Sequence, residues 1–139
     1  MLKKTIKYED YNGVEREEDF YFALNKAEIF ELQTTTEGGF YERINKAVKA
    51  QDMVSVMKLF KDIILKTVGK KSDDGKRFIK SKEISDEFEQ SPAYPILFME
   101  LATDANAAKD FMTAVIPNLT PEQKAEFDKE LAKFEKGEQ

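Results

Sequence analysis

The sequence predicts a mostly helical α+β protein, with an N-terminal β-hairpin followed by a compact bundle of roughly six or seven helices. Alternating residues on both sides of Asn12-Gly13 indicate two strands joined by a tight turn. Later in the chain, apolar residues recur at helical spacing, and polar capping residues precede most of these segments. We expect a single domain over residues 1–139, with the hairpin at about 2–24, a helical body at about 26–116 and a C-terminal helix at about 121–136.

The strands of the hairpin are predicted from alternation in residues 2–8 and 16–24. The residues that share a face within each strand are Leu2, Lys4, Ile6 and Tyr8, and then Phe20, Phe22 and Leu24. A two-residue loop would set Ile6 opposite Asp19, whereas a shift by one residue sets Ile6 opposite Phe20. Because the shifted register pairs apolar residues, we expect a three-residue loop or a bulge at the turn.

Two short helices should follow the hairpin. Asn25 with Glu28 three residues later is a capping-box pattern, which predicts a helix that runs to about Gln33. A threonine- and glycine-rich stretch at 34–39 interrupts that helix. A second helix is predicted at 40–49.

The longest helix is predicted to run to Val68, with Asp52 as its N-cap and Gly69 just after its end. Its apolar residues extend beyond one face, so we expect it to be the central helix. These residues are Met53, Val54, Val56, Met57, Leu59, Phe60, Ile63, Ile64, Leu65 and Val68.

The middle of the chain is predicted to be more irregular. A polar loop at 70–77 leads into a brief extended piece at 78–80. Ser81 or Ser85 then caps a short helix.

Two further helices are predicted before the C-terminal one. Ser91-Pro92 is typical of a helix start, and the regular part of that helix is predicted at 96–102, where the residues are apolar almost all round. Thr103 or Asp104 caps the next helix, which ends before Pro117.

Composition excludes several classes of function. The chain has no cysteine and no histidine, which removes disulfides, thiolate metal sites, the commonest general base and the commonest zinc ligand. A net charge of −5 argues against nucleic acid and against an anionic membrane as the main partner. No apolar run reaches the length of a membrane span, and no signal-peptide core follows the first lysines. We therefore expect a cytoplasmic protein that needs no cofactor.

Three patterns superficially resemble functional sites. Ser72-Asp73-Asp74-Gly75 lacks the alternating oxygen ligands of a calcium loop, and we interpret it as a solvated turn with Gly75 at positive φ. The acidic run at 15–19 is split between two strand faces and is better explained by cross-strand ion pairs. Gly69-Lys70 lacks both the upstream glycine and the following Ser or Thr of a phosphate-binding loop. We predict no catalytic, metal or cofactor site, and no enzymatic activity.

Apolar side chains offer the better candidates, for partner binding. The segment at 96–99 is either a buried core helix or a helix with one side facing a partner. The last helix either docks on the body or contacts another chain, and the methionines at 53, 57, 99 and 112 could form an adaptable surface or part of the core. The candidate partner-binding residues are Phe98, Met99, Phe127, Leu131 and Phe134.

Several segments, in order, resemble the tail assembly chaperones of long-tailed (siphovirus-like) bacteriophages and prophages. They are Tyr8-Glu9-Asp10-Tyr11-Asn12-Gly13, Phe22-Ala23-Leu24-Asn25-Lys26-Ala27-Glu28, Gly69-Lys70-Lys71-Ser72-Asp73-Asp74-Gly75-Lys76-Arg77-Phe78-Ile79-Lys80-Ser81, Phe88-Glu89-Gln90-Ser91-Pro92-Ala93-Tyr94, Glu100-Leu101-Ala102-Thr103-Asp104, Ala107-Ala108 with Phe111, and Val115-Ile116-Pro117. None of these segments is a catalytic motif, so the resemblance carries over no site residues.

The resemblance implies a chaperone that binds the tape measure protein, promotes assembly of the tail tube and often self-associates. It also implies a longer form, made by a programmed frameshift, with an extra domain that binds the tail tube protein. Two other hypotheses remain open: a structural tail completion or connector protein that is retained in the virion, and a regulatory domain that binds a host protein.

Overall fold

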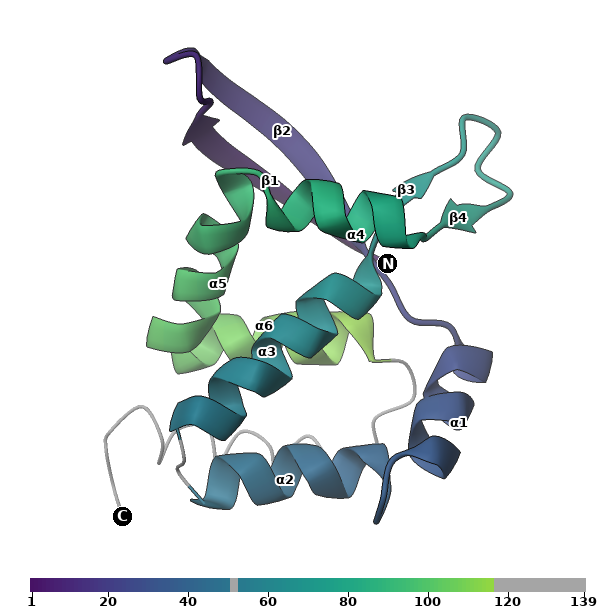
Figure 1. Ribbon diagram of the computed structural model, residues 1–139. Coiled ribbons are helices and arrows are strands. Elements are labelled where there is room, and N and C mark those ends of the chain that lie inside the picture. The colour runs from purple at the N-terminus through teal and green to yellow at the C-terminus, as the bar shows by residue number, and fades with distance from the viewer. Residues whose placement is uncertain (51–52, 117–139) are drawn as a thin grey trace.

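The computed structural model describes residues 1–50 and 53–116, which form a four-stranded antiparallel sheet and six helices (Figure 1). The elements are β1 (Leu2–Glu9), β2 (Glu15–Phe22), α1 (Lys26–Thr35), α2 (Phe40–Ala50), α3 (Met53–Thr67), β3 (Val68–Lys71), β4 (Phe78–Ile79), α4 (Lys82–Glu89), α5 (Ala93–Thr103) and α6 (Ala105–Val115). The strand order in the sheet is β1-β2-β3-β4. The protein is therefore α+β and mostly helical, as predicted.

The hairpin turn has the predicted three-residue loop with a bulge. Gly13 N donates to Asp10 O at 3.0 Å, Asp10 N donates to Val14 O at 2.9 Å, and Gly13 has a φ of +80°. The register, however, differs from the prediction, because Ile6 lies opposite Glu18 and not Phe20.

The Asp10 side chain explains this register. Its carboxylate accepts hydrogen bonds from the backbone N–H groups of Asn12 and Val14, both at 2.9 Å, which fixes the position of the turn. The pairing is displaced by two residues, so each side chain keeps its predicted face. Ile6 and Phe22 both contribute to the core.

The hairpin leads into α1 and α2 much as the sequence predicts. The Asn25 side chain accepts from Glu28 N, while the Glu28 side chain accepts from Asn25 N, which completes the predicted capping box. Helix α1 continues to Thr35, two residues beyond the predicted end, and after a break at 36–39 helix α2 begins at Phe40, whose side chain is buried. The predicted cap Asp52 lies outside the described residues.

The end of α3 corrects the sequence interpretation. The helix stops at Thr67, and Val68 begins β3 without an intervening loop, because Val68 and Gly69 pair with Phe22 and Tyr21 of β2. Gly69 is therefore a strand residue and not a helix end. A Cβ at Gly69 would lie 2.5 Å from Phe78 Cε2 and 2.7 Å from Ile79 O, so the close approach of β4 requires glycine.

The capping residues of α4 and α6 agree with one of the two predicted choices in each case. The Ser81 side chain caps α4 by accepting from Ile84 N at 3.1 Å, whereas the Ser85 hydroxyl donates to Leu65 O of α3. The Asp104 side chain caps α6, which ends at Val115.

The start of α5 differs from the prediction. The helix begins at Ala93 and not at 96, since Pro92 and Pro95 both lie at its N-terminus, where backbone N–H groups need no helical partner. Ser91 does not cap this helix, because its hydroxyl donates to Phe88 O at 2.7 Å.

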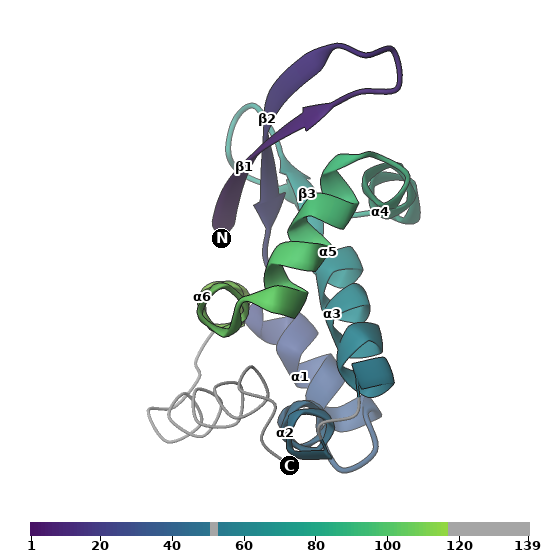
Figure 2. The same cartoon turned by 90° about the vertical axis from the view of Figure 1, so that its left-hand side faces the viewer.

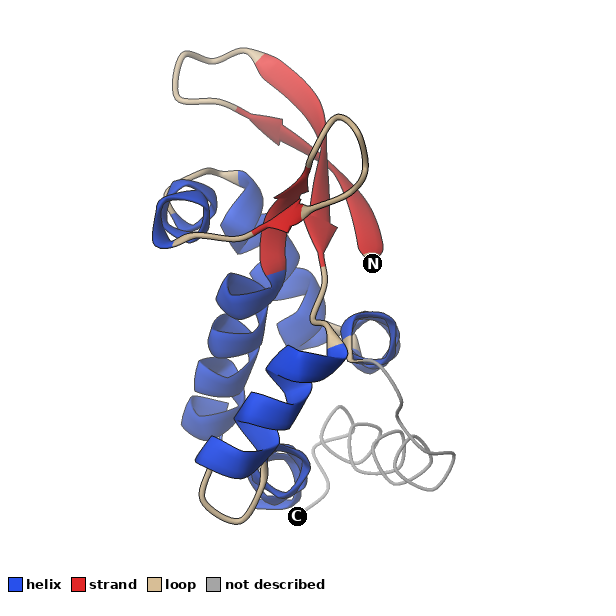
Figure 3. Cartoon of the chain, turned by 90° about the vertical axis from the view of Figure 1, so that its right-hand side faces the viewer, coloured by secondary structure: helices blue, strands red, loops and turns tan. Residues whose placement is uncertain are grey.

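The helices cross one another at different angles, and the predicted bundle is not confirmed. Helices α3 and α5 run side by side, whereas α2, α4 and α6 lie across them (Figures 1 and 2). One core cluster joins the sheet to these helices, through Phe22 of β2, Ile64 of α3, Phe88 of α4, Leu97 of α5 and Phe111 of α6. The turn of the hairpin extends away from the helices, as does the loop between β3 and β4 (Figure 3).

Candidate functional site

Metal binding and membrane insertion are the first two possibilities to consider for the described residues. Among residues 1–50 and 53–116, no three acidic side chains come close enough together to hold a metal ion. No helix in these ranges has the length and apolar character needed to cross a membrane. The candidate sites are therefore surfaces that could hold another polypeptide.

The polar loop between β3 and β4 is a hydrogen-bonded turn. Gly75 has a φ of +75°, as predicted, and Asp74 Oδ1 accepts from the Ser72 hydroxyl and from Lys76 N. These bonds, with the one from Ser72 the largest contribution, hold the pKa of the Asp74 carboxyl below its usual value. Its carboxylate is thus engaged in local structure.

Helix α5 has two apolar sides, of which one is buried. Ala93, Leu97 and Leu101 pack into the core, whereas Ile96 and Met99 are 44% and 54% exposed. A helix with apolar residues all round is usually buried on every side, so this exposure is the feature of α5 that calls for an explanation.

The two α5 residues predicted to bind a partner are in different environments. Met99 lies on the exposed side of the helix. Phe98 is partly buried against the core, with its ring centroid 5.9 Å from that of Tyr94. Met99 is therefore available to a partner, while Phe98 could contribute only part of its ring.

The first turns of α3 form a second exposed apolar surface, from Met53, Val54 and Met57. The sequence places these residues in a wide apolar stripe, but they are not among the predicted partner-binding residues, and neither is Ile96 of α5. The width of the stripe was the available signal, because it exceeds what one buried face requires. Of the four methionines named as adaptable, only Met112 is buried in the core, since Met53, Met57 and Met99 are all exposed.

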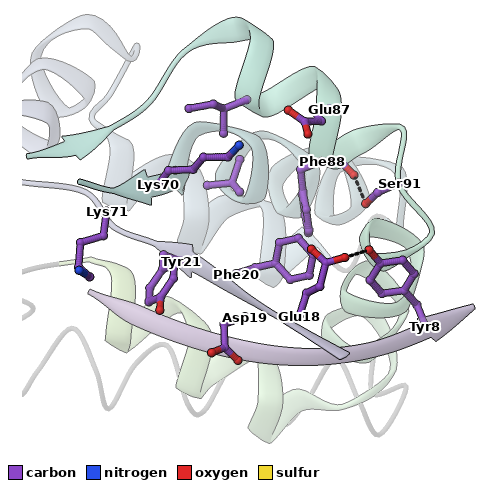
Figure 4. A pocket seen from close by; sticks show the side chains of 13 residues that line it. Tyr8, Glu18, Asp19, Phe20, Tyr21, Lys70, Lys71, Glu87, Phe88 and Ser91 are labelled. Carbon is purple, nitrogen blue, oxygen red and sulfur yellow. Dashed lines mark hydrogen bonds between the residues drawn. The ribbon is translucent and has the colours of Figure 1, made fainter. Parts of the chain in front are cut away.

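A groove with a volume of about 390 Å³ lies between β2, the start of β3 and α4 (Figure 4). Four aromatic side chains line it, those of Tyr8, Phe20, Tyr21 and Phe88, and the ring centroids of Phe20 and Phe88 are 5.0 Å apart. Acidic side chains from β2 and α4 line it as well, together with Lys70 and Lys71 of β3. No pattern in the sequence predicted this groove.

One hydrogen bond defines the hairpin side of the groove. The Tyr8 hydroxyl donates to Glu18 Oε1, and the two side chains point toward each other in Figure 4. This bond is the main reason why the pKa of Tyr8 is raised, with a smaller contribution from burial. The bond holds the Tyr8 and Glu18 side chains together at this side of the groove.

The other predicted partner-binding residues are Phe127, Leu131 and Phe134 of the C-terminal helix expected at 121–136. They lie outside the described residues, so the structure does not test the prediction.

Comparison with known proteins agrees with the resemblance noted in the sequence. A family model described as phage tail assembly chaperone matches residues 1–137, which is nearly the whole chain. No curated protein and no solved structure gives a match. Members of this family assist assembly and are not enzymes. Because this match extends over almost its full length, the chain belongs to the phage tail assembly chaperone family.

Proposed function

We propose that this chaperone binds the tape measure protein of its phage, keeps it soluble and promotes polymerisation of the tail tube around it. Membership of the tail assembly chaperone family supports this proposal. We place the binding surface on α5 because both sides of this helix are apolar but only one of them is buried.

The exposed side chains fit an amphipathic helical partner. Ile96 and Met99 stand three residues apart and so lie on the same side of α5. An amphipathic helix can bind such a surface through its apolar side, and methionine adapts to partners of varied shape. The proposed partner-binding set is therefore Ile96, Phe98 and Met99 of α5, together with Phe127, Leu131 and Phe134 near the C-terminus.

Co-expression with fragments of the tape measure protein tests this surface. We expect the unmodified chain to keep at least one fragment soluble and to co-purify with it. The double variant Ile96→Glu with Met99→Glu should lose that fragment, because two charges would be buried against an apolar partner. Phe30→Glu is the matched control, since Phe30 is also exposed but lies on α1.

Two outcomes would count against the proposal. If no fragment is solubilised by the unmodified chain, tape measure binding loses its support. If Phe30→Glu abolishes binding as fully as the α5 variant, the surface has been placed wrongly. A Met53→Glu and Met57→Glu variant would then show whether α3 provides the contact instead.

The proposal also includes self-association, action in the cytoplasm of the host bacterium and a longer frameshifted form that contacts the tail tube protein. Its gene should lie between those of the tail tube and tape measure proteins, with a slippery heptamer near its end. The alternative, a tail completion or connector protein, predicts that the chain is retained in purified virions. Mass spectrometry of purified particles distinguishes the two, because an assembly chaperone should be absent from them.

A further inference from the structure

Strand β1 pairs with β2 along the whole of β2, whereas β3 pairs with β2 only at its Phe22 end. Ala23 N donates to Thr67 O at 2.9 Å, and Tyr21 lies opposite Gly69. In an antiparallel ladder, alternate residues direct their backbone groups to the same neighbour, so the odd-numbered residues of β2 point away from β1.

Beyond Tyr21, β3 leaves β2. Lys70 and Lys71 pair with Ile79 and Phe78 of β4, and neither pairs with β2. Within the described residues, no strand lies opposite Glu17 or Asp19 on this side. We call residues 15–20 the open edge of β2; its outward backbone groups are those that an added strand would use.

The groove described above lies beside this open edge. Its Phe20 and Phe88 rings form an apolar surface where β3 and β2 separate, and Ile84 of α4 adds to that surface. Phe88 is held in place by further rings, with Phe22 at 5.7 Å and Tyr94 at 6.0 Å between centroids. Strand addition requires backbone groups along an edge and a pocket for alternate side chains, and both are present here.

The charges around the edge select the kind of strand that can bind. The open edge carries Glu15, Glu17, Glu18 and Asp19, and Glu87 lines the groove from α4. Lys70 and Lys71 of β3 also line the groove, so the excess of acidic side chains lies along the edge of β2. Arg16, the one cation of the open edge, is paired with Asp10 at 2.6 Å. A second copy of this edge would bring like charges together, which disfavours pairing between copies. A basic strand is complementary to it.

We propose that the open edge of β2 and the adjoining groove bind an extended peptide segment, in which an apolar side chain flanked by Lys or Arg enters the groove while the backbone adds a strand to the sheet. The site is separate from the exposed residues of α5, and the inference does not depend on tape measure binding.

A synthetic peptide tests the proposal on the unmodified full-length protein. The probe is fluorescein-labelled Lys-Thr-Lys-Phe-Lys-Thr-Lys, and binding is measured by fluorescence anisotropy at low salt. We expect saturable binding. A peptide of the same sequence N-methylated at alternate residues, and one with Glu in place of Lys, should each bind about tenfold more weakly or worse, because one loses backbone donors and the other loses charge complementarity.

Protein variants locate the site. Glu18→Lys combined with Glu87→Lys should weaken binding of the basic peptide by a similar factor. Glu83→Lys is the matched control, because Glu83 is an exposed residue of α4 that does not line the groove. In amide-resolved NMR of the unmodified protein, the largest shift changes should occur at Glu17, Asp19 and Lys70.

Three results would overturn the inference. One is equal affinity for the N-methylated and unmethylated peptides, since strand addition requires backbone hydrogen bonds. Another is equal loss of affinity in the Glu83→Lys control, since that would indicate attraction by net charge alone. The third is a set of NMR shift changes confined to residues away from β2 and the groove.

Discussion

The two ends of β2 belong to the same strand but are in opposite environments. At the Phe22 end, Phe22 is buried, Phe20 and Tyr21 are half-buried, and β3 pairs alongside. At the Glu15 end, charged side chains are exposed and the edge is open. Burying several charges would be costly, whereas burying an aromatic ring is favourable, so the side chains determine where the third strand stays paired. A strand can thus be part of the core at one end and a surface at the other.

The largest effect on stability is expected from Phe22→Ala. This change removes a fully buried ring that contacts the rings of Phe88 and Phe111. We expect the free energy of unfolding to fall by about 3–5 kcal/mol, as measured by chemical denaturation. Phe30→Ala, the same change at an exposed position, should cost no more than about 0.5 kcal/mol. Similar losses from both variants would mean that the Phe22 end is not the buried one.

The next effect is expected from Gly69→Ala, at the point where β3 pairs with β2. The new methyl group would clash with the Phe78 ring and with Ile79 O, and overpacking of this kind costs about 1–3 kcal/mol. Adding Phe78→Leu should restore only part of the loss, because the Ile79 carbonyl belongs to the backbone. Full recovery in the double variant would show that the ring alone requires glycine at this position.

A smaller, pH-dependent effect is expected at the turn beyond the Glu15 end. A hydrogen bond from Arg16, followed by one from Val14 N, lowers the pKa of Asp10. A lowered folded pKa contributes stability above the unfolded value of about 4, and that stability is lost as pH falls through the lower folded value. Asp10→Asn should therefore destabilise the protein at pH 6 and have less effect near pH 2.

Thermal unfolding of both proteins across this range measures the difference. Because the pKa of Asp74 is also lowered, only the difference between the unmodified protein and Asp10→Asn isolates the turn. A difference that does not change with pH would contradict the assigned role of Asp10.

The smallest effect is expected from Glu17→Thr, on the open edge itself. Glu17 pairs with Lys7 at 3.7 Å, and both side chains are exposed, so the pair contributes little. Threonine favours strands, and the free energy of unfolding should change by no more than about 0.5 kcal/mol. A loss as large as that of Gly69→Ala would show that this end of the strand is structurally constrained after all.

Local signals in the sequence predicted much of this fold. The cap at Asn25 was identifiable, and those at Ser81 and Asp104 were each narrowed to two residues, because a cap depends on residues within one helical turn. The buried face of the hairpin was identifiable for the same reason, since alternation decides it. The register was not, because it depends on which backbone groups the Asp10 side chain accepts from.

Features that depend on distant residues were missed. Val68 continues the apolar pattern of α3 and Gly69 is typical of a helix end, and only their pairing with β2 makes them strand residues. Met99 was among the candidate partner-binding residues, but the exposure of Ile96 was missed, since a helix that is apolar all round gives no sign of which side packs. The groove was missed because it arises where two strands separate, which no single segment encodes.

The direct junction between α3 and β3 has a mechanical consequence. No linker separates Thr67 from Val68, so the helix and the strand have no hinge between them. With 15 residues at about 1.5 Å each, α3 is roughly 22 Å long. Exposed Met53 lies at one end of the helix, and the point where β3 separates from β2 lies at the other. Because α3 is packed into the core from Val56 onward, a partner bound at Met53 would reach the point where β2 and β3 separate only by shifting the whole helix.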